Sequence, residues 1–550
     1  MRNCAASRVF RSRRASTIAG QPPDQAADRE GRGRRLGLST AFFSFATALS
    51  RVAGLGREIV AAVYFGVGAQ ATAFTIAFQI PNLVRALFAD LALTGAFVPV
   101  FSELIARGER REAFRVASTL LFGITLVLGL LTGLFILFAP SIMPLFLPGL
   151  PELSGLTVGL SRLLFPIVLL LAISGLVVGM LNSFEHFSVP ALAPLAWNIV
   201  IIAALVGLVP IFPEGEQIYA YAIGIVAGTF VQLVLPMPWL RGRGGRFSFT
   251  FDWRNPHVIR VLKLMLPVTL ALGLINFSLV INSIVGSLVS VSAPAAIDKA
   301  FRIYMLPQGI FSIAIATILF PTLSKLAARG DYADLRDTMA NGIRQMSMFL
   351  IPSAVVMAVL AEPIIRLVYQ RGVFDAAATS LVSTALFWWA LSLPFQGASL
   401  LYSRTFFSLQ RPWVNTGLAG LSLVVNVAVS VALYEPLGVA GVVLGTVVAT
   451  VAMTIAQAVL LRGRLDGIDG PRTLAASAKM LAAAALLGAV SYFSWGEIDA
   501  LLGRSLLGQI GSVGIAIGLG SLVYALAVWV LRVPEAAQAW SLIAGRIGRR

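Results

Sequence analysis

Residues 48–108 read ALSRVAGLGREIVAAVYFGVGAQATAFTIAFQIPNLVRALFADLALTGAFVPVFSELIARG, two long apolar runs joined by a short polar turn. Charged residues inside these runs include Arg51, Arg57, Glu58, Arg85 and Asp90. A charge at membrane depth costs roughly 2.5–3.5 kcal/mol on insertion scales. A chain that keeps several such charges in its first hairpin is expected to use them, so we predict a cationic cavity that accepts an anionic substrate.

The composition is that of a membrane protein. Of the 550 residues, 58% are hydrophobic and only 12% are charged, about half the charged fraction of a soluble protein. The formal net charge of +17 is assigned to Lys and Arg in cytoplasmic loops. No basic soluble domain is evident, which argues against nucleic-acid binding. The single cysteine, Cys4, excludes an intramolecular disulfide.

The apolar runs predict an all-α polytopic protein with about fourteen transmembrane helices. The predicted spans are 37–66, 70–104, 114–138, 156–183, 188–209, 219–240, 257–289, 295–327, 342–369, 376–408, 413–434, 437–461, 472–494 and 508–531. One set of alternate loops is rich in arginine and the other set is poor in cations. This asymmetry predicts that both termini are cytoplasmic, which requires an even number of spans.

The first twelve spans form an internal repeat. PVFSELIARG at 99–108 matches PTLSKLAARG at 321–330, an offset of 222, and Pro140 to Gly149 parallels Pro363 to Gly372 at an offset of 223. The chain therefore contains two copies of a six-helix unit. Because six is even, the copies run parallel, as lobes related by a pseudo-two-fold axis along the membrane normal. Two extra C-terminal helices follow.

The repeat and the segments that flank it divide the chain into five parts. They are a disordered basic cytoplasmic tail at 1–36, an N-lobe at 37–246, a C-lobe at 247–466, the two extra helices at 467–532, and a second cytoplasmic tail at 533–550.

The candidate site combines charges from spans 1, 2 and 8. Arg51 and Glu58 are seven residues apart and share a helix face, and Asp298 and Arg302 have the i, i+4 spacing of an ion pair. The candidate charges comprise five cations and three acids, a net charge of +2. The cations are Arg51, Arg57, Arg85, Lys299 and Arg302, and the acids are Glu58, Asp90 and Asp298. We assign substrate binding to Arg51, Arg57, Arg85 and Arg302, and gating ion pairs to Glu58, Asp90, Asp298 and Lys299. The alternative is that these charges pair internally or reach the interface, and only fix helix packing.

Catalytic and metal motifs are missing from the sequence. It contains no phosphate-binding loop of the GxxxxGK[ST] type and no HExxH, so an enzyme is not expected. His186 and His257 have no metal-ligand partners nearby in the sequence. Asn198, Asn276, Asn282 and Asn426 could bind a cation, although hydrogen bonds between helices are the simpler role. We expect no cofactor. We expect the energy for transport to come from coupling to a monovalent cation or from the membrane potential.

Several motifs resemble those of the MurJ (MviN) family of lipid II flippases, within the multidrug/oligosaccharidyl-lipid/polysaccharide exporter superfamily. They are SRVAGLGRE at 50–58, IPNLVRALFAD at 80–90, AFVPVFSE at 96–103, PTLSKLAARGD at 321–331, EPIIRLVYQRGVFD at 362–375 and RTFFSLQRP at 404–412. The family's essential arginines fall on Arg51, Arg57, Arg85 and Arg302, and its acidic partners on Glu58 and Asp90. The chain departs from the family at Thr72 and Met305, where acids are usual, and at Ala86, where a second base is usual.

The resemblance implies a V-shaped transporter in the bacterial cytoplasmic membrane. Its substrate would be lipid II, the undecaprenyl-diphosphate-linked muropeptide, exported for cell wall synthesis, with membrane lipids and the cell wall synthesis machinery as partners. The two extra helices would form a groove for the lipid tail. Alternatives are a flippase for another polyprenyl-diphosphate-linked glycan and a membrane scaffold that transports nothing.

Overall fold

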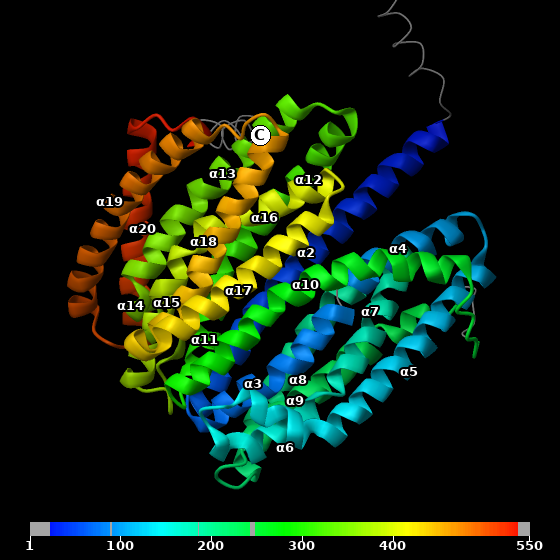
Figure 1. The fold of residues 1–550 in the computed structure, drawn as a ribbon, viewed down its shortest axis with the longest axis horizontal. Coiled ribbons are helices and arrows are strands. Elements are labelled where there is room, and N and C mark those ends of the chain that lie inside the picture. Colours follow the sequence, from blue (N-terminus) through cyan, green and yellow to red (C-terminus); the bar gives the residue numbers. More distant parts are fainter. Residues whose placement is uncertain (1–22, 89–90, 185, 243–247, 537–550) are drawn as a thin grey trace, which may run out of the picture.

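The computed structural model describes residues 23–88, 91–184, 186–242 and 248–536, which are almost entirely helical and contain no strand (Figure 1). The first repeat contains α2 (Pro23–Phe65), α3 (Ala69–Phe88), α4 (Leu91–Ala106), α5 (Arg110–Ile142), α6 (Ser154–Leu164), α7 (Ile167–Ser183), α8 (Ser188–Leu208) and α9 (Ile218–Val234). The second contains α10 (Pro256–Val289), α11 (Ala293–Pro307), a π-helix (Gln308–Ser312), α12 (Ile313–Arg329), α13 (Tyr332–Val359), α14 (Ala361–Tyr369), α15 (Ala376–Leu391), α16 (Leu393–Ser408), α17 (Pro412–Leu437) and α18 (Val439–Arg464). The last two helices are α19 (Gly470–Leu502) and α20 (Leu506–Val530).

Each of the fourteen predicted spans coincides with one helix or with consecutive helices. Within the described residues, ten helices are long and apolar enough to cross a membrane. The count becomes eleven when α15 and α16, bent by 47° at Ser392, are taken as one span. The predicted spans 37–66, 70–104 and 257–289 are not among these eleven. The structure is thus a polytopic helical membrane protein, and fourteen spans are compatible with it.

The first helix begins earlier than predicted. Residues 23–36, assigned to a disordered tail, form the start of α2, with Pro23 as its first residue. Alanine, glutamine, glutamate and arginine in this stretch favour a helix, and proline is well tolerated in a first turn. Residues 1–22 of the predicted tail lie outside the described residues. α3 continues through Pro81 to Phe88.

The helix boundaries repeat with the same offset as the sequence. α5 begins at Arg110 and α13 at Tyr332, 222 residues later. α6 and α15 begin at Ser154 and Ala376, again 222 residues apart. The start of α2 and the end of α20 lie at the same end of the molecule (Figure 1). The two repeats thus form two lobes of matching topology.

α10 joins the lobes instead of belonging to one. Its first half packs into the core of the first lobe through Val258 and Val261, and Arg260 forms an ion pair with Glu103 of α4. Its second half contacts α17 and α18, where the Asn282 amide donates to the Thr446 hydroxyl at 2.9 Å. The sequence assigned this helix to the second lobe because periodicity shows which faces are apolar, and not which neighbours cover them.

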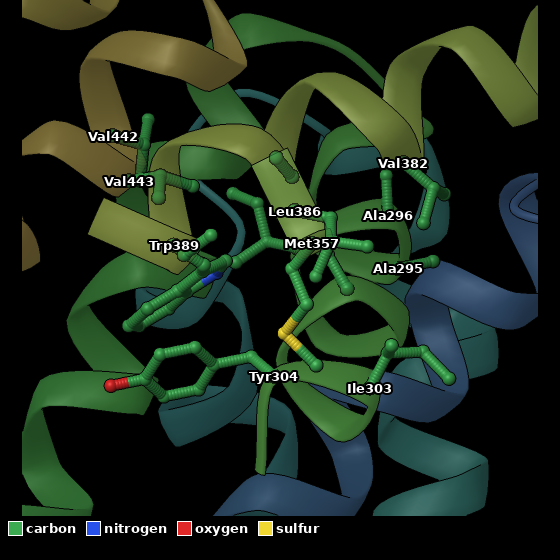
Figure 2. Close-up of a cluster of buried hydrophobic side chains, with 14 of the residues drawn as sticks. Ala295, Ala296, Ile303, Tyr304, Met357, Val382, Leu386, Trp389, Val442 and Val443 are labelled. Carbon is green, nitrogen blue, oxygen red and sulfur yellow. The ribbon is translucent and has the colours of Figure 1, made fainter. Parts of the chain in front are cut away.

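Aromatic and aliphatic side chains fill the second lobe. Figure 2 shows Tyr304 of α11 beside Trp389 of α15, with the Met357 side chain of α13 reaching towards them. The Tyr304 and Trp389 ring centroids are 5.1 Å apart. Alanines such as Ala295 and Ala296 on α11 are fully buried, and small residues of this kind let membrane helices approach closely. This packing fixes α11, which contributes Asp298, Lys299 and Arg302 to the candidate site.

α19 and α20 are fixed to α13 and α14 at both ends. At one end Arg344 of α13 donates to Asp469 at 2.8 Å and to the buried Glu535 at 2.6 Å. At the other end Arg366 of α14 forms an ion pair with Asp499 of α19. Between them lies an apolar cluster of Met348, Ile351, Ala476, Met480, Ala483, Ala484, Val528 and Val533.

We predict that Arg344→Ala destabilises the docking of these two helices. The substitution leaves two largely buried carboxylates without their partner, and breaking a buried ion pair costs about 3 kcal/mol. Thermal unfolding of the purified protein in detergent should shift to a lower temperature. Arg336→Ala is the control, because its partner Asp337 is exposed and such pairs contribute less than about 1 kcal/mol. Equal unfolding temperatures for the two variants would contradict the prediction.

Candidate functional site

A cavity of about 360 Å³ lies between the lobes. Its walls come mainly from α2, α3, α10 and α11, with Ile218 and Tyr221 of α9 completing one side. The charged side chains that line it are Glu58, Asp298, Lys299 and Arg302, and the amide side chains are Gln79, Asn82 and Asn276. The cavity therefore has a charged wall on α2 and α11 and a neutral polar wall on α3 and α10.

The charged wall is organised by one carboxylate oxygen. Glu58 Oε1 accepts from Arg57 Nη2 and forms a 3.0 Å ion pair with Arg302 Nη1. Arg302 Nε also donates to Asp298 Oδ2 at 2.8 Å, which confirms the i, i+4 pair expected from the sequence. Arg57 and Glu58 belong to the first lobe and Arg302 to the second. This oxygen thus connects the two lobes at the cavity wall.

Arg57 is held behind this wall and does not line the cavity. Only 7% of the residue is exposed, and its guanidinium carbon lies 4.5 Å from the ring centroid of Trp197 in α8. The aromatic ring and the Glu58 carboxylate together compensate the buried charge. The sequence grouped Arg57 with Arg302 as a direct ligand, whereas the geometry makes it the anchor of Glu58.

Lys299 faces the cavity from a buried position. Its Nζ lies 5.3 Å from the ring centroid of Tyr369, and no salt bridge within 4.0 Å involves it among the described residues. Arg57, Glu58, Asp298, Lys299 and Arg302 together carry a net charge of +1. The net charge of this cluster is positive, although it is smaller than the net charge of +2 carried by the eight candidate residues named from the sequence.

The remaining candidates lie elsewhere. Arg51 is exposed, and its Nη1 lies 3.7 Å from the position a Cβ at Gly309 would take, so it faces the π-helix of the second lobe. Arg85 donates from Nε and Nη2 to Asn82 Oδ1, at 3.1 and 2.8 Å. Neither arginine lines the cavity. Asp90 lies outside the described residues.

The neutral wall was not predicted from the sequence. Thr75, Gln79 and Asn82 lie at i, i+4 and i+7 on α3, a polar stripe on one face of an apolar helix, and all three line the cavity. The i, i+4, i+7 spacing of these polar residues in an apolar run is the sequence signal for this wall. Arg85 reaches the cavity indirectly, through the Asn82 side chain that it holds.

Two of the three departures from the family, Thr72 and Met305, have different positions. The Thr72 hydroxyl donates to the Val291 carbonyl at 2.5 Å, which joins α3 to the turn between α10 and α11. Met305 lines the cavity next to Arg302, with an apolar side chain in place of an acid.

The buried asparagines connect helices. Asn282, Asn426, Ser430 and Thr446 form one hydrogen-bonded network across α10, α17 and α18. Asn198 donates to the Ser50 carbonyl at 3.3 Å and so joins α8 to α2. Across the described part of the chain, no three acidic, histidine or cysteine side chains lie close enough to hold a metal ion.

Two matched helical lobes around a polar cavity define a membrane transporter. The fold is shared with an inward-facing multidrug resistance MATE family transporter of the MOP superfamily, with a TM-score of 0.64 and 17% identity, covering 76% of this chain and 94% of that one. A solved structure titled lipid II flippase MurJ, inward closed conformation, gives a TM-score of 0.73 at 25% identity, covering 89% of this chain and 98% of that one.

Sequence comparison identifies the family. The family described as lipid II flippase MurJ matches residues 61–525. A probable lipid II flippase MurJ of Rhizobium meliloti is 33% identical over 405 residues, which are 72% of this chain and 75% of the relative. The chain belongs to the MurJ family of lipid II flippases.

We predict that Glu58→Gln destabilises the contact between the lobes. It leaves Arg57 and Arg302 facing each other across a neutral amide, and losing one member of a buried charge network costs roughly 3 kcal/mol or more. The unfolding temperature in detergent should fall. Glu362→Gln, at an exposed position on α14, is the matched control and should leave it unchanged. A Glu58→Gln protein as stable as this control would show that the shared carboxylate is dispensable.

Proposed function

We propose that this protein carries lipid II from the inner to the outer leaflet of the bacterial cytoplasmic membrane by alternating access, for cell wall synthesis. As a MurJ family member it is a transporter and not an enzyme. The observation that carries the proposal is the cavity between the two lobes, whose charged wall contains a carboxylate shared by both lobes.

The diphosphate binds to the charged wall. Arg302 offers a planar guanidinium that can pair with phosphate through two hydrogen bonds, and Lys299 adds a point charge. A phosphate at Arg302 competes with Glu58 for the same donors. Substrate binding therefore weakens the Glu58–Arg302 ion pair between the lobes and favours their rearrangement, as a ligand does when it prefers one of two states.

The neutral wall faces the rest of the head group. Gln79, Asn82 and Asn276 offer amide groups that suit the hydroxyl and amide groups of a sugar and a peptide. The polyprenyl tail stays in the lipid, and α19 and α20 guide it. The machinery that consumes the precursor would receive it at the outer leaflet.

The cytoplasmic location of both termini is part of this proposal. With the inside negative, outward movement of an anion gains roughly 2.3 kcal/mol per charge for each 100 mV of membrane potential. The return of an empty cavity with net positive charge is favoured by the same potential. Coupling to a monovalent cation is the alternative source of energy.

We expect Arg302→Ala to abolish transport, because it removes the guanidinium at the cavity wall. In a strain depleted of its own flippase, the variant should reach the membrane, fail to support growth and let lipid II accumulate in the inner leaflet. Arg57→Ala should have the same effect by releasing Glu58. Arg336→Ala, outside the cavity, is the control. Normal growth with Arg302→Ala would favour a packing role for these charges.

Collapse of the membrane potential should slow transport if the potential supplies the energy. The test measures appearance of lipid II at the outer leaflet before and after addition of an ionophore that removes the potential. An unchanged rate would overturn the energetic part of the proposal and leave the assignment of substrate intact.

A further inference from the structure

Two glycines at equivalent positions of the repeats each contact the first helix of the opposite repeat. Gly149 follows α5 in the first repeat, and Gly372 follows α14 in the second, 223 residues later. Gly149 lies against the end of α10, and Gly372 against the end of α2. Since α2 and α10 are the first helices of the two repeats, the two contacts are equivalent under the pseudo-two-fold axis.

Both contacts are too close for any side chain. A Cβ at Gly149 would lie 2.2 Å from the carbonyl oxygen of Ser287 and 2.9 Å from the Cα of Leu288. A Cβ at Gly372 would lie 2.3 Å from the carbonyl oxygen of Val63 and 2.8 Å from its Cγ1. Real Cβ atoms essentially never approach within 3.0 Å of such atoms, and backbone cannot move aside as a flexible side chain can. The observed lobe arrangement therefore requires glycine at both positions.

Further backbone contacts surround the second glycine. The Val373 amide donates to the Val63 carbonyl at 3.1 Å, a direct backbone hydrogen bond between the lobes. Gly66, with φ +54°, brings its Cα next to the Val373 carbonyl, 3.2 Å from where its Cβ would be. Gly372 itself has φ +61°, which L side chains rarely adopt, whereas Gly149 has no positive φ. Gly149 is therefore constrained by contact alone.

The contact at Gly372 lies beside the cavity. Ala61 and Phe65 line the cavity, and Val63 lies between them on α2. The contacts lie at the end opposite the start of α2 and the end of α20 (Figure 1). In the proposed orientation this is the outer side of the membrane.

We propose that Gly149 and Gly372 form a paired backbone gate that closes the outer end of the cavity and separates when the transporter opens outward. The inference rests on the alternating access proposed above and adds the structural element that performs it. Glycine is needed only in the closed state, because the contacts disappear when the lobes part. A methyl group at Gly149, which is constrained by contact alone, thus opposes closure without opposing the outward-open state.

The test uses Gly149→Ala, which adds a methyl group without backbone strain. In a Cys4→Ser background, Ala71→Cys places the single thiol in the cavity. Labelling by a membrane-impermeant thiol reagent added outside should rise roughly fivefold over the parent, as overpacking at the low end of its usual cost predicts. Gly155→Ala is the matched control, because nothing lies within 4 Å of its Cβ position. Equal labelling in the two variants would overturn the gate.

A cross-link gives a second measurement that does not depend on tolerance of alanine. Val63→Cys with Val373→Cys, again without Cys4, places two thiols on the residues that share the backbone hydrogen bond. Oxidation in membranes should form a disulfide that blocks outside labelling of a cavity cysteine and stops transport, and a reductant should restore both. Failure to cross-link, or transport that continues with the bond intact, would overturn the gate. Because labelling does not depend on which substrate is carried, a wrong substrate assignment would leave this result standing.

Discussion

One carboxylate oxygen of Glu58 receives a guanidinium from each lobe, and the central cavity is built around this interaction. Two arginines and a glutamate in a place with little water are stable only as a set, because removal of any one leaves an uncompensated charge. The set is also sensitive, since an incoming phosphate offers Arg302 a partner of the same sign as Glu58. The same contact can therefore hold the lobes together and respond to the substrate.

The four arginines that the sequence grouped together have four different environments, and Arg51 faces the π-helix of the second lobe. Arg302 faces the cavity, Arg57 lies behind Glu58 and over Trp197, and Arg85 holds Asn82. This division follows from the cost of burying charge, since each guanidinium needs a specific partner for its donors. Buried cations in a transporter thus include side chains that position others, and a loss of function in a variant does not by itself identify a substrate ligand.

The sequence predicted the fold well and the roles of individual residues less well. Apolar runs and the 222-residue repeat identify helices and lobes because they reflect membrane thickness and gene duplication, which leave direct traces in the chain. The pairing of Asp298 with Arg302 follows from helix geometry and is confirmed. Local sequence patterns do not encode contacts between helices that are distant in the chain. Such contacts determine the packing of α10 on both lobes, the position of Arg51 at the π-helix and the role of Asn82.

The two appended helices have become structurally inseparable from the second lobe. A chain shortened after Arg464 would leave the guanidinium groups of Arg344 and Arg366 without carboxylates and uncover the apolar stripe around Met348. A twelve-helix version of this molecule is therefore not obtained by deletion alone. Engineering a minimal core would require neutral replacements at both arginines and a new lipid-compatible surface on α13.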